Sequence, residues 1–283
     1  MSDAEETRAA QREHWARAAP GWTKRRTEVQ RFAEPVSRWM LDSAQLAPGQ
    51  RVLELAAGAG ETGLLAAQRI APGGTLVASD MAEEMLSGIE SRAAELGLDN
   101  VETRRVELEW IDAPAAEFDA VLCRWGLMFA VDVEAALREI RRVLKPGGRL
   151  AAATWSGPED NQWGTAIQRT LLEQGHVEAP PDPDGPGPFR LRDPAALIEL
   201  ARSAGLAEVV IEPIDIAMTY ESVDALLEVQ SDLSVLLTEA LGRVDERSRA
   251  ALRDGVAEKL AQFTADDGSV RIPGRALGLA ATA

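Results

Sequence analysis

The sequence predicts an α/β fold in which a mainly parallel sheet carries helices on both faces. Short apolar runs typical of buried strands recur between residues 51 and 155, and segments with helical periodicity fill the intervals between them. Turns containing Gly and Pro separate the two kinds of segment. Parallel strands need a crossover connection, which is usually a helix, so this alternation indicates parallel pairing rather than hairpins.

The alternating region supplies most of the expected sheet. The turn "KPGG" at 145–148 precedes its last strand, and the strand before the second helix ends on Asp80. The apolar runs predict strands at 51–57, 75–80, 101–106, 117–125 and 149–155, and the periodic segments predict helices at 61–70, 81–98 and 132–144.

Segments on either side extend this core. Residues 179–190 carry so much Pro and Gly that no regular element can cross them, and both a flexible spacer and a lid are open interpretations. The remaining pattern predicts helices at 3–18, 28–46, 159–174 and 194–206, a strand at 207–218, two amphipathic segments at about 222–242 and 244–263, and a final strand at 269–282.

These elements predict four consecutive regions. An amino-terminal helical segment at 1–46 precedes the core at 47–218, and a helical insertion at 219–266 precedes the final core strand at 267–283. The insertion is apolar on one face, so it either caps a pocket or serves a homodimer.

Composition and charge narrow the expected function. The 283-residue chain has a net charge of −16, which disfavours a nucleic-acid partner because phosphate backbones require clustered Lys and Arg. The single cysteine, Cys123, cannot form an internal disulfide and fits a reducing cytoplasm. With that one cysteine and two distant histidines, His14 and His176, no metal site is expected. No apolar run approaches the roughly 20 residues of a membrane span, so the sequence predicts a cytoplasmic protein.

The turn after the first strand carries three glycines with the spacing G-x-G-x-x-G, at Gly58, Gly60 and Gly63. By itself this pattern indicates only a tight turn that approaches a ligand or a neighbouring helix closely. Glu54 lies in the preceding strand and Glu61 in the first turn of the following helix. These acids would repel a dinucleotide pyrophosphate, which helix amino termini otherwise attract, so the turn suits a cationic ligand better.

Three ordered stretches resemble one enzyme family. "VLELAAGAGETG" at 52–63, "LVASDMAEEML" at 76–86 and "FDAVLCRWGLMFAVDVEAALREIRRVLKPGGRLAAATW" at 118–155 are similar to motifs of class I S-adenosylmethionine-dependent methyltransferases, in the branch of the ubiquinone and menaquinone biosynthesis enzymes. The resemblance implies a Rossmann-like, doubly wound sheet of seven strands with an antiparallel last strand. It also implies S-adenosyl-L-methionine as cofactor and S-adenosyl-L-homocysteine as product.

The resemblance assigns roles to single residues. Glu54 is expected to face the methionine ammonium, and Asp80 to hold the two ribose hydroxyls unless it is an ordinary helix cap. Glu107 stands where the family usually has an aspartate that contacts adenine, so that contact is left open. The implied cofactor-contacting residues are Glu54, Ala56, Gly58, Gly60, Asp80, Met81, Glu107, Leu108 and Cys123.

Methyl transfer from a sulfonium needs alignment and desolvation more than covalent help. His14 and Arg124 are the candidate catalytic residues, although a surface position is the simpler interpretation of His14. The candidate acceptor pocket consists of Trp15, Trp22, Arg124 and Trp125, and core packing is the alternative for Trp125. The amino-terminal aromatic residues either form a lid over the cofactor or fasten two helices to the sheet.

Rival functions stay open at this level. A nicotinamide-dependent oxidoreductase shares the glycine turn, but the only tyrosine, Tyr220, is followed by Asp224 where a short-chain reductase carries Lys. The fold could also bind the cofactor without transferring methyl, or catalyse another reaction. We expect a small, largely apolar organic acceptor, because the additional helices and seven tryptophans offer an apolar cover.

Overall fold

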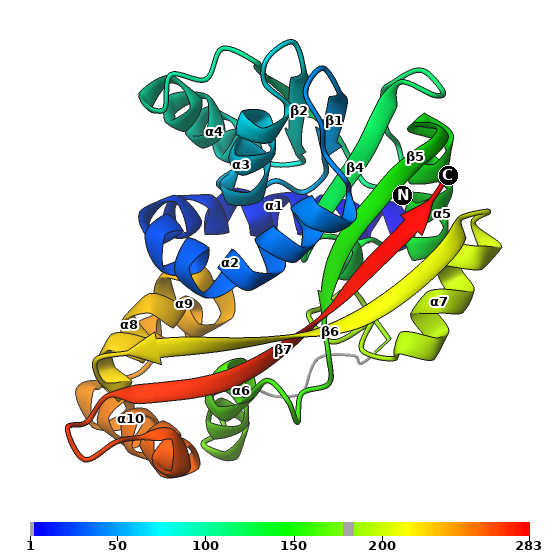
Figure 1. The fold of residues 1–283 in the computed structure, drawn as a ribbon. Coiled ribbons are helices and arrows are strands. Elements are labelled where there is room, and N and C mark those ends of the chain that lie inside the picture. The colour runs from blue at the N-terminus through cyan, green and yellow to red at the C-terminus, as the bar shows by residue number, and fades with distance from the viewer. Residues whose placement is uncertain (1–2, 178–183) are drawn as a thin grey trace.

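The computed structural model contains one sheet of seven strands in the order β3-β2-β1-β4-β5-β7-β6 (Figure 1). Neighbouring strands from β3 to β5 pair in parallel, whereas β7 is antiparallel to both β5 and β6. The strands are β1 (Arg51–Glu54), β2 (Thr75–Asp80), β3 (Val101–Arg105), β4 (Phe118–Arg124), β5 (Leu144–Trp155), β6 (Ala207–Tyr220) and β7 (Val270–Thr282). This arrangement confirms the predicted, mainly parallel sheet with an antiparallel last strand.

The structure describes residues 3–177 and 184–283, so residues 179–183 of the expected Pro- and Gly-rich loop lie outside the described residues. The described end of that loop is fastened to the segment after β4. The Gly187 N–H donates to the Met128 carbonyl at 3.1 Å, and the Arg190 guanidinium donates to the carbonyls of Ala130 and Val131.

Helices pack on the sheet because its strands are buried apolar runs that must be covered on both faces. Leu76, Val77 and Ala78 of β2 illustrate this, since all three are fully buried. The helices are α1 (Asp3–Lys24), α2 (Arg26–Ser43), α3 (Glu61–Ile70), α4 (Glu83–Glu95), α5 (Val133–Val143), α6 (Gln162–Glu173), α7 (Pro194–Ser203), α8 (Val223–Leu233), α9 (Val235–Gly242) and α10 (Glu246–Leu260), with two short 3₁₀ helices, η1 (Leu127–Phe129) and η2 (Ala261–Phe263).

Several element boundaries differ from the predicted ones, and three of these differences change the local structure. Helix α1 continues through Pro20 to Lys24, past its expected end at residue 18. The expected single segment at 222–242 is two helices, because Ser234 adopts an extended conformation and its side chain caps α9 at the Leu237 N–H. The turn "KPGG" lies within β5, where the pairing register with β4 shifts between Phe118 and Ala120.

The insertion between β6 and β7 is helical, as predicted. Figure 1 shows β6 and β7 as a long antiparallel pair that extends beyond the parallel strands, with α8 and α10 at its far end. Helix α1 reaches this region. Gly21 packs so closely on α8 that an added Cβ would lie 1.7 Å from the Asp232 carbonyl oxygen, and Lys24 and Arg25 form ion pairs with the Asp232 carboxylate at 2.8 and 2.5 Å.

None of the described helices combines the length and the apolar character that crossing a bilayer requires.

Candidate active site at the carboxyl edge of the parallel strands

The site lies where the strand order reverses, between β1 and β4. In open α/β sheets, ligands bind outside the carboxyl ends of the strands at such a switch point. The two strand ends approach each other closely. A Cβ added to Gly126 would lie 2.5 Å from the Ala56 Cβ and 2.8 Å from the Cys123 Sγ, so only glycine fits there.

The glycine turn after β1 has left-handed backbone conformations. Ala56, Gly58 and Gly60 have φ values of +50°, +57° and +83°. Glycine adopts this region without steric cost, whereas alanine does so under strain. A Cβ on Gly58 would meet no atom within 4 Å, so the backbone of this residue faces open space. The turn therefore leaves room for a ligand against its backbone.

Glu54, at the end of β1, is a buried carboxylate with only 2% of its surface exposed. It fits beneath the first turn of α3 because Gly63 has no side chain; a Cβ there would lie 2.0 Å from Glu54 Oε2. Burial raises the pKa of Glu54 to about 8, although nearby Arg124 opposes the shift. Glu54 Oε2 has no hydrogen-bond partner among the described residues.

Glu61 and Arg124 form a buried ion pair next to Glu54. Arg124 Nη2 donates to Glu61 Oε2 at 2.6 Å, and the two side chains are only 5–6% exposed. The guanidinium carbon also lies 4.8 Å from the Trp125 ring centroid, within the range of a cation–π contact. Burial raises the pKa of Glu61, and Arg124 opposes that shift. The sequence indicated Glu61 as an acid that suits a cationic ligand, but it did not indicate the ion pair with Arg124.

Asp80 connects the end of β2 to the glycine turn. Its carboxylate accepts from the Gly58 N–H at 2.9 Å and from the Ala82 N–H at 3.0 Å. Burial raises the pKa of Asp80, and these backbone donors oppose the shift. The structure thus brings Glu54, Gly58 and Asp80 to one place, although their motifs lie apart in the chain.

The other expected cofactor residues lie around this centre. Met81 follows Asp80 and is partly buried, and Leu108 is buried after β3. Glu107 accepts from Arg12 of α1 at 2.6 Å. Cys123 is fully buried in β4, and burial raises the pKa of its thiol to about 12, so it acts as a small apolar side chain rather than as a thiolate.

Helix α1 covers the neighbourhood of β2 and η1. The Trp15 ring lies edge-on to Phe129 of η1 at 5.0 Å and to Trp22 at 6.1 Å. Trp15 and Trp22 also pack on a small cluster formed by Ala19, Ala82 and Met85. These contacts place α1 over the start of α4, directly after Asp80.

His14 faces a different environment from Arg124. Its ring lies edge-on to Trp15 at 5.2 Å, and partial burial and the charge of Arg17 lower its pKa, while Glu239 of α9 opposes the shift. The structure places His14 beside the insertion, whereas Arg124 lies at the switch point.

Trp125 begins a row of aromatic rings that sequence reasoning did not identify. Its backbone has φ +58°, which is strained for a non-glycine residue. Its ring stacks on Trp155 of β5 with centroids 4.3 Å apart and planes 15° apart, and on Phe32 of α2 at 5.9 Å. Trp155 in turn contacts Trp163 of α6 at 5.0 Å. The row provides an apolar wall beside Arg124.

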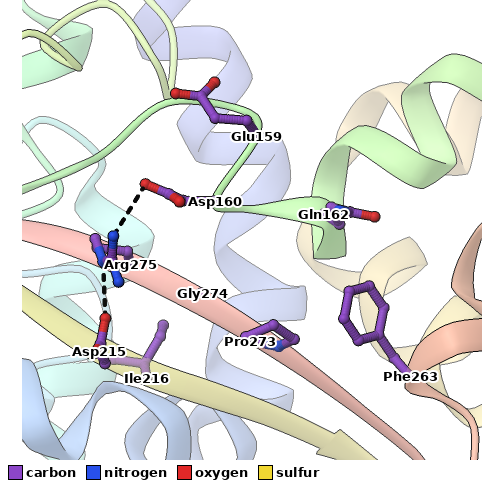
Figure 2. A pocket seen from close by; sticks show the side chains of 9 residues that line it. All are labelled: Glu159, Asp160, Gln162, Asp215, Ile216, Phe263, Pro273, Gly274 and Arg275. Carbon is purple, nitrogen blue, oxygen red and sulfur yellow. Dashed lines mark hydrogen bonds and ion pairs between the residues drawn. The ribbon is translucent and has the colours of Figure 1, made fainter.

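A separate cavity of about 350 Å³ lies between the β5–α6 connection and the antiparallel pair of β6 and β7. Figure 2 shows Arg275 of β7 joined to Asp215 at 2.8 Å and to Asp160 at 3.7 Å, with Phe263 on the opposite side. None of the predicted site residues lines this cavity.

Comparison with known proteins gives a consistent result. Residues 52–148 match the model of a methyltransferase domain. The chain is 29% identical over 204 residues to the nocamycin O-methyltransferase of Saccharothrix syringae, covering 69% of this chain and 73% of that protein. It is 37% identical over 123 residues to the ubiquinone/menaquinone biosynthesis C-methyltransferase of Stenotrophomonas maltophilia, covering 42% of this chain and 47% of that enzyme. An uncharacterised protein of Mycobacterium tuberculosis matches at 34% identity, and the chain spans only 43% of its length.

Solved structures share the fold at low sequence identity. The YcgJ protein of Bacillus subtilis aligns with a TM-score of 0.56 and 19% identity over 87% of this chain and 97% of that chain. The [4+2]-cyclase SpnF aligns with a TM-score of 0.54 and 20% identity over 88% and 80% of the two chains. Residues 52–148 thus form a methyltransferase domain, and this part of the chain is similar to the ubiquinone and menaquinone biosynthesis C-methyltransferases, whereas the solved structures show that the fold is shared.

Proposed function

We propose that this protein transfers a methyl group from S-adenosylmethionine to a small, largely apolar organic acceptor. The observation that supports this best is the buried Glu54 carboxylate, whose Oε2 has no partner in the part of the chain that the structure describes, behind a glycine turn that Asp80 holds in place. An unpaired buried carboxylate oxygen suits a cationic ammonium group. Open space at Gly58 leaves room for the ligand beside it.

The residues present fit the cofactor of this family. Glu54 would hold the methionine ammonium, Asp80 the ribose hydroxyls, and the backbone of Gly58 and Gly60 the edge of the methionine. Asp80 has both carboxylate oxygens fixed by backbone donors, so its position is set before a ligand arrives. When bound, S-adenosylmethionine supplies a methyl group that is already activated on a sulfonium.

The chain contributes to the reaction mainly by excluding water and aligning the acceptor. The stacked Trp125 and Trp155 close the site from the side of β5, and Trp15 and Phe129 close it from the side of α1. Proximity and orientation can supply on the order of 7–11 kcal/mol in such a reaction. This arrangement supports a lid function for α1, which would have to move for ligands to enter.

The same features guide the choice of acceptor. Aromatic side chains line the neighbourhood of Arg124, which favours an apolar ring or chain, and the net charge of −16 disfavours polyanions. The similarity to an O-methyltransferase supports an oxygen acceptor, and the similarity to a C-methyltransferase supports a carbon acceptor. The reducing cytoplasm is the proposed compartment, and the α8–α10 region either caps the pocket or forms a homodimer contact.

Calorimetry tests the cofactor assignment. We expect S-adenosylmethionine and S-adenosylhomocysteine to bind at micromolar concentrations and nicotinamide dinucleotides not to bind. Incubating cell extract with cofactor labelled in the methyl group then tests the acceptor class, and we expect label in small organic products. Tight NAD binding without any response to S-adenosylhomocysteine would overturn the cofactor assignment, and label mainly in RNA or DNA would overturn the acceptor class.

A further inference from the structure

The carboxyl edge of β1 and β4 concentrates buried polar atoms that have no partner. Of the seven such side-chain atoms found among the described residues, five lie here. Two are acceptors, Glu54 Oε2 and Glu61 Oε1. Three are donors, Arg124 Nε, Arg124 Nη1 and Trp125 Nε1. The donors and acceptors thus gather within one site, yet they do not satisfy one another.

This gathering carries a physical cost that a ligand would remove. More than 90% of buried polar groups in proteins have a hydrogen-bond partner. Each unsatisfied buried group costs about 1–3 kcal/mol. The acceptor atom Glu54 Oε2 is accounted for by the proposed cofactor ammonium. The three N–H donors still lack an acceptor, because neither a guanidinium nor an indole nitrogen can accept a hydrogen bond.

The donors are held in place rather than free to turn elsewhere. Glu61 fixes Arg124 through Nη2 at 2.6 Å, whereas Nε and Nη1 have no partner among the described residues. Trp125 is fixed by its stack on Trp155 at 4.3 Å and by a strained backbone at φ +58°. Strain of this kind persists only where surrounding structure enforces it, and it concentrates at functional sites.

We propose that Arg124 and Trp125 bind an oxygen anion of the methyl acceptor, so that the acceptor is an ionised phenol, enol or carboxylic acid. This inference rests on the proposed methyl-transfer function. The unpartnered N–H groups of Arg124 and Trp125 provide donors for an acceptor oxygen, and the aromatic row beside them suits a planar, apolar body.

The position of the donors points to the acceptor rather than to the cofactor. The residues proposed to hold the cofactor lie on β1 and β2, whereas Arg124 and Trp125 lie at the end of β4, and their aromatic neighbour Trp155 lies on β5. The donors are therefore on the far side of β1 from Asp80.

The chemistry balances without a base. A lone pair of the acceptor oxyanion forms the new O–C bond as the S–C bond breaks, and the bonding pair stays on the sulfur, which becomes a neutral thioether. The acceptor enters already deprotonated, so no proton has to leave during the step. Arg124 stabilises the anionic form on binding and orients the oxygen for in-line attack.

The test observes the Trp125 indole directly. The ¹⁵N-labelled protein is titrated with 4-nitrophenolate, with and without saturating S-adenosylhomocysteine, and the Trp125 indole N–H signal is identified by its absence from Trp125→Phe. We expect 4-nitrophenolate to shift this signal, and its neutral methyl ether, 4-nitroanisole, to leave it unchanged. Arg124→Met should weaken 4-nitrophenolate binding at least about tenfold, since hydrogen bonds to charged groups are worth about 1.5–3 kcal/mol.

Control variants and control ligands distinguish a loss of binding from a loss of folding, and an acceptor oxygen from the cofactor carboxylate. Arg124→Lys keeps the charge and should fold normally, yet it should bind 4-nitrophenolate more weakly because it lacks the planar fork. Equal shifts from the phenolate and its ether would overturn the proposal, as would no shift from either. A third result would also overturn the proposal. If S-adenosylhomocysteine shifted the Trp125 signal, its decarboxylated analogue did not, and 4-nitrophenolate caused no change, the donors would be assigned to the cofactor carboxylate. Calorimetry with S-adenosylhomocysteine tests the proposed function. The titration with 4-nitrophenolate in the absence of cofactor tests the oxyanion site, so the two can fail independently.

Discussion

Two buried polar clusters lie close to the carboxyl ends of the central strands, and they differ in whether their polar atoms have hydrogen-bond partners. Around Asn161, after β5, every polar side-chain atom is used: Nδ2 donates to the carbonyls of Gly157 and Arg275, and Oδ1 accepts from the Arg275 N–H and the Trp163 indole. Around Arg124, after β4, five buried atoms have no partner among the described residues. Asn161 is fully buried and Arg124 nearly so, so exposure does not explain the difference.

The comparison separates structural polar groups from those that await a ligand. The Asn161 cluster fastens the β5–α6 connection to β7 and needs nothing further. The cavity beside it (Figure 2) is bordered by the exposed pairs of Arg275 with Asp160 and Asp215, which already satisfy one another. The Arg124 cluster is incomplete by itself. Changes in the first cluster should therefore alter stability, and changes in the second should alter binding.

The largest expected effect is on stability, from Asn161→Leu. This substitution leaves the partly buried Arg275 N–H and Trp163 indole N–H without acceptors, at up to about 1–3 kcal/mol each. We expect the free energy of unfolding to fall by about 3 kcal/mol or more, with the cofactor affinity of the folded protein unchanged. Denaturant unfolding and calorimetry measure the two quantities. Asp215→Ala is the matched control, since its exposed ion pair should contribute less than about 1 kcal/mol.

The opposite result would break the comparison. If Asn161→Leu weakened S-adenosylhomocysteine binding as strongly as it lowered stability, the Asn161 cluster would have to be counted as part of the binding site.

Deletion of residues 1–24 should have the next largest effect, on turnover. Helix α1 connects the cofactor side, through Arg12 and Glu107 at 2.6 Å, to the insertion, through Trp22 and the Leu233 carbonyl at 3.3 Å. If α1 is a lid, its loss admits water and misaligns the acceptor, so turnover should fall on the order of 100-fold while the core stays folded. Methyl-transfer rates and melting temperatures are measured on the same preparation.

Arg17→Ala is the control for this deletion, because the Arg17–Glu239 ion pair is exposed and should contribute little. A lower melting temperature with unchanged turnover per folded molecule would show that α1 is a structural element and not a lid.

Asp80→Ala should weaken S-adenosylhomocysteine binding by tens of fold. It removes the ribose acceptor and also the partner of the Gly58 N–H, each a hydrogen bond to a charged group worth about 1.5–3 kcal/mol. Calorimetric titration measures the dissociation constant, and Asp42→Ala, an exposed acid paired with Arg69, serves as control. An affinity within twofold of the wild type would favour the simple helix-cap role for Asp80.

The smallest expected effect is a proton linkage at Glu54. The pKa of Glu54 is about 8 in the folded protein against an ordinary value of 4.5, so the folded state holds more protons than the unfolded state between these values. The contribution of Glu54 to the free energy of unfolding is therefore full below pH 4.5 and falls as the pH rises to about 8. An ammonium ligand favours the ionised form, so cofactor binding near pH 7 should release up to one proton.

Calorimetry in buffers of different ionisation enthalpy detects this proton. Glu54→Gln should abolish the release and become more stable relative to wild type as the pH rises through the same window. Identical proton release by the two proteins would show that Glu54 does not face the ammonium.

The sequence predicted local elements well, because their signals are local. The helix at 61–70 and the strand at 75–80 have the predicted bounds, since each begins directly after a turn that contains glycine. Contacts between distant residues could not be predicted in this way. Glu61 and Arg124 are 63 positions apart, and nothing in either segment indicates the other. The apolar periodicity continues across Ser234, so the sequence pattern does not indicate that the helix is interrupted there. The structure shows the interruption, because the Ser234 side chain caps α9.

The position of β7 near the end of the chain determines when its partner strands can pair during synthesis. The parallel strands are all translated by residue 155, and their sheet order needs no later residue. Strand β6 is different, because its only strand neighbour among the described residues is β7, which emerges from the ribosome some 50 residues afterwards. Until then β6 exposes two edges with unpaired backbone groups, a condition that favours association with other chains. A nonsense codon at the start of β7 would therefore remove the strand that pairs with both β5 and β6.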